Sequence, residues 1–345
     1  MSYISKPLND YYLKKKALIE KSIESIIPLT CTVESMNHIV GRVDLSWDFT
    51  TLQKTFFDIV QKYLNRRTEK IICLDICLFL EAAGQELKKF IPILGFPIYF
   101  EISNEIFLNI TDWANKNGHK SDGISSLDIS IAGNVSIALL TLPSHNLLFH
   151  RLDLDPEKLL KLYESFTTNI FNSLFGNGLK LFWEQSKKIP ADLKEYYGAV
   201  SLLNKGFLKF AADLWLIFNE RSHDKFLVSV LNRFEENRII AIQIEKDLLS
   251  YERMQIELNR TNHFNPLSNF LFIHAANKFN DISDSQKKYS VEDLVEFIGR
   301  AGSVQYAKEQ IIEFKRISDG ALNLLPIESR FKELINSYCD YLVIK

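Results

Sequence analysis

From residue 49 onward, apolar side chains recur at intervals of three and four residues, in segments long enough to form helices. The first such stripe consists of Leu52, Phe56, Ile59, Val60 and Tyr63. This spacing places apolar side chains on one face of an α-helix, whereas a half-buried strand alternates at every second residue. The pattern therefore predicts an all-α fold, and no pair of segments has the alternation of a strand pair.

Further helices are expected between glycine and proline residues, which interrupt helices for backbone reasons. They are 69–84, 98–117, 124–141, 156–175, 192–219, 224–255, 266–279, 291–299, 303–319 and 327–343. Segments 124–141 and 206–218 are apolar nearly all round, which is typical of central helices. Asp155-Pro156-Glu157 and Ser290 with the residues after it read as helix starts. We interpret residues 1–47 as an N-terminal extension and 48–345 as one helical domain.

Composition and charge exclude several classes of protein. The 345 residues are 46% hydrophobic, which is enough for a sizeable core, and 41 basic and 43 acidic residues leave a net charge of −2. Such a balance favours no nucleic acid as a partner. The longest apolar runs are interrupted by charge or proline, so no transmembrane segment is expected.

The four cysteines form neither a CxxC pair nor a regular framework, which suits a reducing, cytoplasmic location. Cys73 and Cys77 are one helical turn apart and have the spacing of half a metal site. No His or Cys pair completes it, so we interpret them as buried thiols. His263 and His274 are assigned no role.

One segment carries a specific motif. Ala241-Ile242-Gln243-Ile244-Glu245-Lys246-Asp247-Leu248-Leu249-Ser250 resembles the second aspartate-rich motif of the trans-prenyltransferases, FQIxDDLLD. Further landmarks of that family fall in order along residues 50 to 345. They are Glu81-Ala82-Ala83-Gly84-Gln85 (EAAGG), residues 101–115 (ELIHxxSLIHDDxxD), Ala132-Gly133-Asn134 (AGN), Asn204-Lys205-Gly206-Phe207-Leu208 (KTGxL) and the closing helix from Ala321 to Tyr341.

The resemblance implies an isoprenoid-synthase-type helical bundle with a central apolar cavity. In such enzymes two aspartate clusters on facing helices hold magnesium ions that bridge a diphosphate. Divalent cations are suited to this task because negative charge builds up as an allylic diphosphate leaves. The family also implies association through helices, so the expected partners are an isoprenoid diphosphate or prenyl ligand and a second chain, in a homodimer or a heterodimer with an active prenyltransferase.

Both aspartate clusters are depleted. The first reads Thr111-Asp112-Trp113-Ala114-Asn115, and the second reads Lys246-Asp247-Leu248-Leu249-Ser250. One carboxylate of three remains in each, and the ammonium group of Lys246 opposes a metal ion through charge repulsion. The candidate catalytic residues are Asp112 and Asp247, and the weak candidate magnesium ligands are Asp112, Asn115, Asp247 and Ser250.

The basic elements that resemble diphosphate-binding motifs are altered as well. Arg66 and Arg67 remain in the GGKRLRP-like stretch, but Glu69 stands where a further arginine is expected. Asn204 replaces the lysine of KTGxL, with Lys205 beside it. The candidate diphosphate-binding residues are therefore Arg66, Arg67, Lys205, Lys246 and Gln243.

Alternative interpretations stand beside several of these roles. Lys246 is either a replacement for the metal that contacts phosphate or a lysine paired with Asp112 across the old cleft. Gln243 either belongs to the site or satisfies a buried backbone group. Phe107, four residues before Thr111, either limits prenyl chain length or belongs to the core. Residues 246–254 also resemble the NDLLSYEKE triad of class I terpene cyclases, but its first and third ligands would be Lys246 and Met254.

Three functions follow from these patterns. The first is a weakly or non-catalytic polyprenyl-synthetase-like protein that binds a prenyl diphosphate or prenyl chain, with a role as partner subunit of an active enzyme. The second is a divergent active prenyltransferase or terpene synthase that uses Asp112, Asp247 and Mg²⁺. The third is a helical module that retains only a cavity for a lipid. We favour the first, in which magnesium has no role, because four of six aspartates are missing.

Overall fold

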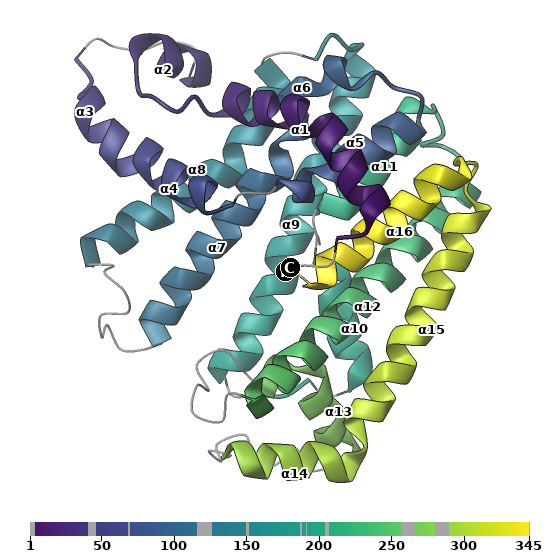
Figure 1. The fold of residues 1–345 in the computed structure, drawn as a ribbon. Coiled ribbons are helices and arrows are strands. Elements are labelled where there is room, and N and C mark those ends of the chain that lie inside the picture. The colour runs from purple at the N-terminus through teal and green to yellow at the C-terminus, as the bar shows by residue number, and fades with distance from the viewer. Residues whose placement is uncertain are drawn as a thin grey trace. The chain divides into compact units, whose positions relative to one another are not determined.

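The computed structural model describes residues 4–40, 46–67, 70–115, 126–149, 152–186, 188–190, 192–203, 207–256, 266–279 and 290–344, without the side chains of 40, 111–115, 126–128, 145–149 and 344. Within these ranges every regular element is a helix and no strand occurs, so the predicted all-α class is confirmed (Figure 1). The prediction for His263 falls outside the described residues.

The chain divides into two compact units, which are described separately. The N-terminal unit comprises Lys6–Thr167 and Asp213–Phe218, and the C-terminal unit comprises Met1–Ser5, Thr168–Ala212 and Asn219–Lys345. This division groups residues by their contacts and does not test the predicted boundary at residue 48. The predicted domains therefore stay a prediction.

Helices of very different lengths follow one another in the N-terminal unit. They are α1 (Lys6–Ile26), α2 (Val33–Val40), α3 (Phe49–Leu52), α4 (Asp58–Arg66), α5 (Leu74–Ala82), α6 (Ile91–Leu94), α7 (Phe96–Asn115) and α8 (Ser126–Phe149). A π-helical turn, Gln53–Phe57, joins α3 to α4, and 3₁₀ turns at Ile71–Cys73 and Leu87–Phe90 precede α5 and α6. Both Cys73 and Cys77 are fully buried, as expected, and neither takes part in a disulfide.

Helix α1, which belongs to the predicted extension, is hydrogen-bonded to the residues around the start of α7. The Ser22 hydroxyl accepts a hydrogen bond from the Gly95 amide at 2.7 Å, and the Tyr99 hydroxyl donates to the Ile23 carbonyl at 2.6 Å. A Cβ atom at Gly95 would lie 3.0 Å from the Ile26 side chain, so glycine allows this close approach.

Two serines hold α7 and α8 together at a close crossing. The Ser103 hydroxyl donates to the Ser136 carbonyl at 2.9 Å, and the Ser136 hydroxyl donates to the Ser103 carbonyl at 3.0 Å. Both side chains are buried, so the exchange satisfies polar groups that have lost water. It fixes the orientation of α7, whose last turn carries the first aspartate-like cluster.

The C-terminal unit is built around one long helix, α12 (Lys225–Ile256), which packs along α15 (Ser303–Leu324) and α16 (Ser329–Ile344) (Figure 1). The other helices of the unit are α10 (Leu193–Leu202), α13 (Phe270–Phe279) and α14 (Val291–Ala301). Two helices contribute to both units, α9 (Pro156–Ser186) and α11 (Leu208–Phe218). The expected starts of α9 and α14 are confirmed, and Ser290 with Asp293 forms a reciprocal capping box.

Three of the expected helices, 124–141, 156–175 and 303–319, were predicted to end too early. In the structure α8 continues through Pro143, α9 through Gly176 and α15 through Gly320. Gly176 instead lies where α9 packs closely against α10. A Cβ atom there would lie 2.7 Å from the carbonyl oxygen of Ala199, so only glycine lets α9 and α10 approach this closely. Nothing in the structure explains the tolerance of Pro143.

The predicted helix 192–219 is wrong in the opposite way, because it is two helices. The chain leaves the helix after Leu202, and Phe207 has a φ of 62°, in the left-handed region that a helix excludes. The second piece, α11, is buried along most of its length, as its all-round apolar sequence predicts. Helix α8 matches that prediction only in part, because Ile137 is 62% exposed.

One stretch of the described chain, Leu87–Ile110, is long and apolar enough to cross a membrane by length and composition alone. It consists of a 3₁₀ turn followed by α6 and α7, and 61% of its most apolar window is buried inside the protein. Core helices pass the same test, so the expected absence of a transmembrane segment stays a prediction.

Candidate functional site

The motif that resembles FQIxDDLLD lies in the middle of α12, where its polar residues share one side of the helix but differ in burial. Asp247 and Gln243 are buried, whereas Lys246 and Ser250, one turn apart, are half-buried. Residues three and four positions apart lie on the same side of a helix, so Lys246 and Ser250 form the more exposed edge of that side and the single carboxylate of the cluster lies at its buried edge.

The Asp247 carboxylate is surrounded by hydrogen-bond donors of the C-terminal unit. Its Oδ2 atom accepts from the Tyr196 hydroxyl and from the Phe270 amide, both at 2.8 Å, and Oδ1 accepts from the Gln243 side-chain amide at 2.6 Å. Burial, then the charge of Asp247, raises the pKa of Tyr196 well above its ordinary value, so Tyr196 remains a donor. Three donors on one carboxylate leave it little capacity for another ligand.

This donor set does not fit a magnesium ion at α12. Magnesium requires several oxygen ligands in octahedral geometry, usually including carboxylates. Here the carboxylate is engaged and its neighbour is a cation. No cluster of three or more His, Cys, Asp or Glu side chains occurs among the residues that the structure describes.

The basic residues of the N-terminal unit have partners of their own. Arg67 donates from Nη2 to the Glu105 carboxylate of α7 at 2.5 Å, and the Arg66 guanidinium lies 5.3 Å from the centre of the Tyr63 ring. Glu105 precedes Asp112 by two helical turns on α7. A diphosphate would have to compete with Glu105 for Arg67, and diphosphate binding by either arginine stays a prediction.

The EAAGG-like segment is tied to the first helix. Glu81 accepts hydrogen bonds from the Tyr11 hydroxyl at 2.7 Å and from the Lys15 ammonium at 2.5 Å. Gly84 follows with a φ of 71°, which favours glycine and confirms the expected end of the helix predicted at 69–84.

On α7, Phe107 is 48% exposed and therefore is not an ordinary core residue. Its role in limiting prenyl chain length stays a prediction.

Several candidate residues cannot be placed. Lys205 lies outside the described residues, and so do the side chains of Asp112 and Asn115, although their backbone belongs to α7. Because Asp112 and Asp247 belong to different units, the predicted convergence of the two clusters also stays a prediction.

The sequence did not reveal the donors that surround Asp247. Tyr196 comes from α10 and Phe270 from the first turn of α13, and Asn269 adds a hydrogen bond from its side chain to the Asp247 carbonyl at 2.9 Å. Only Asn269 carries a local signal, because asparagine is a preferred helix N-cap and its Oδ1 accepts from the Leu271 amide at 3.0 Å.

His274 is expected to make stability depend on pH. Its ring stacks on Tyr306, with ring centres 4.2 Å apart, and its Nδ1 atom lies 2.9 Å from the Ser303 hydroxyl. Burial, and then the charge of Lys278, lowers the pKa of His274 below 6.5. The unfolded chain therefore binds the proton more readily, and the free energy of unfolding should fall as pH decreases through 6.5 and stay constant above it.

Urea denaturation of the wild type and of His274→Gln at pH 7.5 and pH 5.5 checks this expectation. The variant should lose the part of the pH dependence that His274 causes, and an identical dependence in both proteins would contradict it.

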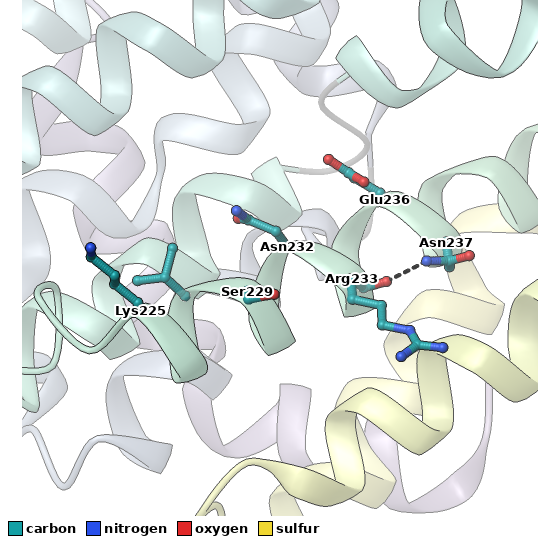
Figure 2. A pocket seen from close by; sticks show the side chains of 7 residues that line it. Lys225, Ser229, Asn232, Arg233, Glu236 and Asn237 are labelled. Carbon is teal, nitrogen blue, oxygen red and sulfur yellow. Dashed lines mark hydrogen bonds between the residues drawn. The ribbon is translucent and has the colours of Figure 1, made fainter. Parts of the chain in front are cut away.

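A shallow hollow of about 430 Å³ lies elsewhere on α12 and contains none of the candidate residues. Figure 2 shows that its side chains all come from the first half of this helix, and that the Asn237 amide donates to the Arg233 carbonyl at 2.7 Å. A hollow lined by one helix with mixed charges provides no enclosed ligand site.

The chain was compared with known protein families, curated proteins and solved structures, and the last of these comparisons identifies its fold. No protein-family model matches the chain. The geranylgeranyl pyrophosphate synthetase of the archaeon Geoglobus acetivorans has a TM-score of 0.70 at 16% identity, with 99% of each chain covered. The geranylgeranyl pyrophosphate synthase of Corynebacterium glutamicum, solved with isoprenyl diphosphate and magnesium, has a TM-score of 0.69 at 12% identity, covering 95% of this chain and 97% of that one.

These likenesses show that the chain has the all-α isoprenoid-synthase fold of the prenyl diphosphate synthases. Among curated proteins, the geranylgeranyl pyrophosphate synthase atmG of Aspergillus flavus is 25% identical over 196 residues. These residues are 53% of this chain and 55% of that protein, so the match spans about half the length of each. The predicted resemblance to the trans-prenyltransferases is confirmed as a likeness of fold, together with this distant relative.

Proposed function

We propose that the chain is a polyprenyl-synthetase-like protein of isoprenoid metabolism that binds a prenyl diphosphate or prenyl chain and is weakly or non-catalytic. One observation carries the proposal. On α12 the half-buried face of the motif presents Lys246 and Ser250, and the remaining carboxylate, Asp247, is occupied by three donors. Such a helix lacks the anionic oxygens that hold magnesium against a leaving diphosphate.

Lys246 is the proposed diphosphate contact on this helix. Its half-buried side chain lies on the motif face, and an ammonium group binds phosphate oxygens as a point charge. Arg66, Arg67 and Lys205 are proposed to contribute in the same way. The four cysteines are free, which supports a reducing, cytoplasmic location.

A divergent active enzyme is the second candidate. One observation of the sequence favours it, because an aspartate survives in each cluster at the same place in the pattern. In this reading Asp112 and Asp247 act with magnesium, and Asp247 would first have to exchange its hydrogen bonds for the metal.

The proposed partner is a second copy of this chain, bound through an apolar stripe on the C-terminal part of α9. The stripe consists of Phe171, Leu174, Phe175, Leu179 and Phe182, each at least 40% exposed. These positions, at intervals of three and four residues, share one face of the helix. Gly178 lies among them with open space at its Cβ position, which would receive an aromatic ring of the second copy.

The size of the stripe supports a partner. Its exposed area is on the order of 500 Å², which is comparable to the largest apolar patch of a typical monomer, a patch that is often functional, and forms most of the roughly 800 Å² that each partner buries in a stable complex. A face of this kind is complementary to itself in a two-fold dimer. A heterodimer with an active prenyltransferase is the alternative.

Turnover assays separate the two candidate functions. The purified chain is incubated with Mg²⁺, isopentenyl diphosphate and allylic diphosphates, beside an active prenyl diphosphate synthase. Metal ions supply several kcal/mol of transition-state stabilisation, so we expect turnover at least about a thousandfold below the active enzyme. Native mass spectrometry of the protein purified from cells should show a bound prenyl species.

One control variant makes the assay decisive. Asp112→Ala should leave any residual turnover unchanged if the chain is non-catalytic. Efficient product formation that Asp112→Ala abolishes would contradict the proposal and support the active enzyme.

A further inference from the structure

We infer that Asp247 is a positioning residue that fixes the first turn of α13 on α12, and that it is not a metal ligand. The inference goes beyond the proposed function, because it concerns this carboxylate whether or not the chain converts a diphosphate. It follows from the hydrogen-bond partners of Asp247, the place of those partners in the fold, and the burial of its side chain.

The carboxylate stabilises the beginning of a helix. The first amides of a helix have no partner within it, and Phe270 is the first residue of α13. Its amide donates to Asp247 Oδ2 at 2.8 Å, and the following amide of the same turn, that of Leu271, donates to the Asn269 side chain at 3.0 Å. A negative charge at this end also interacts favourably with the helix dipole.

The same residue joins a third helix. The Tyr196 hydroxyl of α10 donates to Oδ2, and the Tyr196 ring lies 5.4 Å from the Phe270 ring, centre to centre. Tyr196 is fully buried, and Asp247 is 7% exposed. Because neither group is well exposed to water, loss of Asp247 removes the buried acceptor of the Tyr196 hydroxyl, and loss of that hydroxyl removes one of three donors from the carboxylate.

The motif residues therefore differ in burial and in what they contact. Positions 246 and 250 are half-buried and carry a lysine and a serine, which a ligand can approach. Position 247 is buried and packs against α10 and α13. A metal ion that bound Asp247 would have to displace an amide, a hydroxyl or the Gln243 side chain, all within 2.8 Å, and would leave that donor buried without a partner.

Asp247→Asn, Tyr196→Phe and the double variant test the inference in the full chain, with Ser250→Ala, at a half-buried position one turn away, as a control. Thermal unfolding is followed with and without Mg²⁺ and inorganic pyrophosphate, and hydrogen exchange is followed for peptides of α13. Each single variant should lower Tm by about 2 °C or more, and the double variant by less than the sum, because the two groups share one hydrogen bond.

Hydrogen exchange gives a local readout that a general loss of stability would not produce. In Asp247→Asn, the amides of the first turn of α13 should exchange at least about tenfold faster, while the amides of α16 change little. Ser250→Ala should leave both unchanged.

The ligand readout decides between positioning and metal binding. Any Tm increase from Mg²⁺ with pyrophosphate should be the same in Asp247→Asn as in the wild type, and the absence of an increase in both supports the inference as well. An increase in the wild type that Asp247→Asn abolishes would overturn it, as would additive effects of the two substitutions. Neither result depends on prenyl binding or turnover. The proposed function is tested by other measurements, so either proposal can fail while the other holds.

Discussion

Replacing Arg238 with alanine is expected to lower the free energy of unfolding by about 3 kcal/mol, the lower end of the range for breaking a buried ion pair. The Arg238 side chain is 3% exposed on α12, and Nη2 donates to Asp319 Oδ1 on α15 at 2.6 Å and to the Asn336 side chain on α16. One guanidinium therefore joins three helices. Asp319 is 45% exposed and regains water after the substitution, which limits the loss.

Urea denaturation measures this loss, and the chain offers a matched control. Arg316→Ala also removes an arginine from an ion pair, with Glu313, but Arg316 is 69% exposed and the pair lies within one helix. Exposed pairs contribute little, so this variant should unfold almost like the wild type. Similar losses in both variants would contradict the importance of burial at Arg238.

Periodicity in the sequence predicted the helices because the core of this protein is helical throughout. Helix α12 was expected at 224–255 and extends from Lys225 to Ile256. The capping box at Ser290 was also visible, because its residues are neighbours in the chain. Signals of this kind are local, so one sequence is sufficient to find them.

The errors arose where packing overrides a local preference. Gly176 was expected to end a helix, yet its missing side chain serves the contact with the Ala199 carbonyl on α10. The opposite error is a helix that was predicted to continue. Residues 192–219 look like one continuous helix in the sequence, but Phe207, just before α11, has a left-handed φ that a helix excludes. Neither position can be assigned without knowing which residues it meets.

The candidate site was predictable in position but not in orientation. The motif showed that Asp247 is the one carboxylate that remains in the cluster Lys246-Asp247-Leu248-Leu249-Ser250. That it faces donors from Tyr196 and Phe270 depends on contacts across 51 and 23 residues, which no local pattern reveals. The pairing of Arg67 with Glu105, across 38 residues, was hidden for the same reason.

Substituting glutamate for Phe175 is expected to convert the proposed dimer into a monomer, with Kd raised at least about a hundredfold. In a two-fold interface the substitution occurs twice, and each copy loses the burial of an aromatic ring and places a carboxylate in an apolar contact. Phe175 is 62% exposed in the single chain and stacks on Phe171, with ring centres 6.5 Å apart, so its removal leaves the fold of the monomer largely intact.

Sedimentation velocity over a range of concentrations measures the change, and Phe226→Glu is the matched control. Phe226 is also 62% exposed but lies at the start of α12, outside the stripe, so this variant should remain dimeric. A wild type that sediments as a monomer, and forms a complex only when an active prenyltransferase is added, would reject the second copy as the partner. If Phe175→Glu then prevented that complex, the stripe would be the surface for a heterodimer, and the chain would act through the active site of its partner.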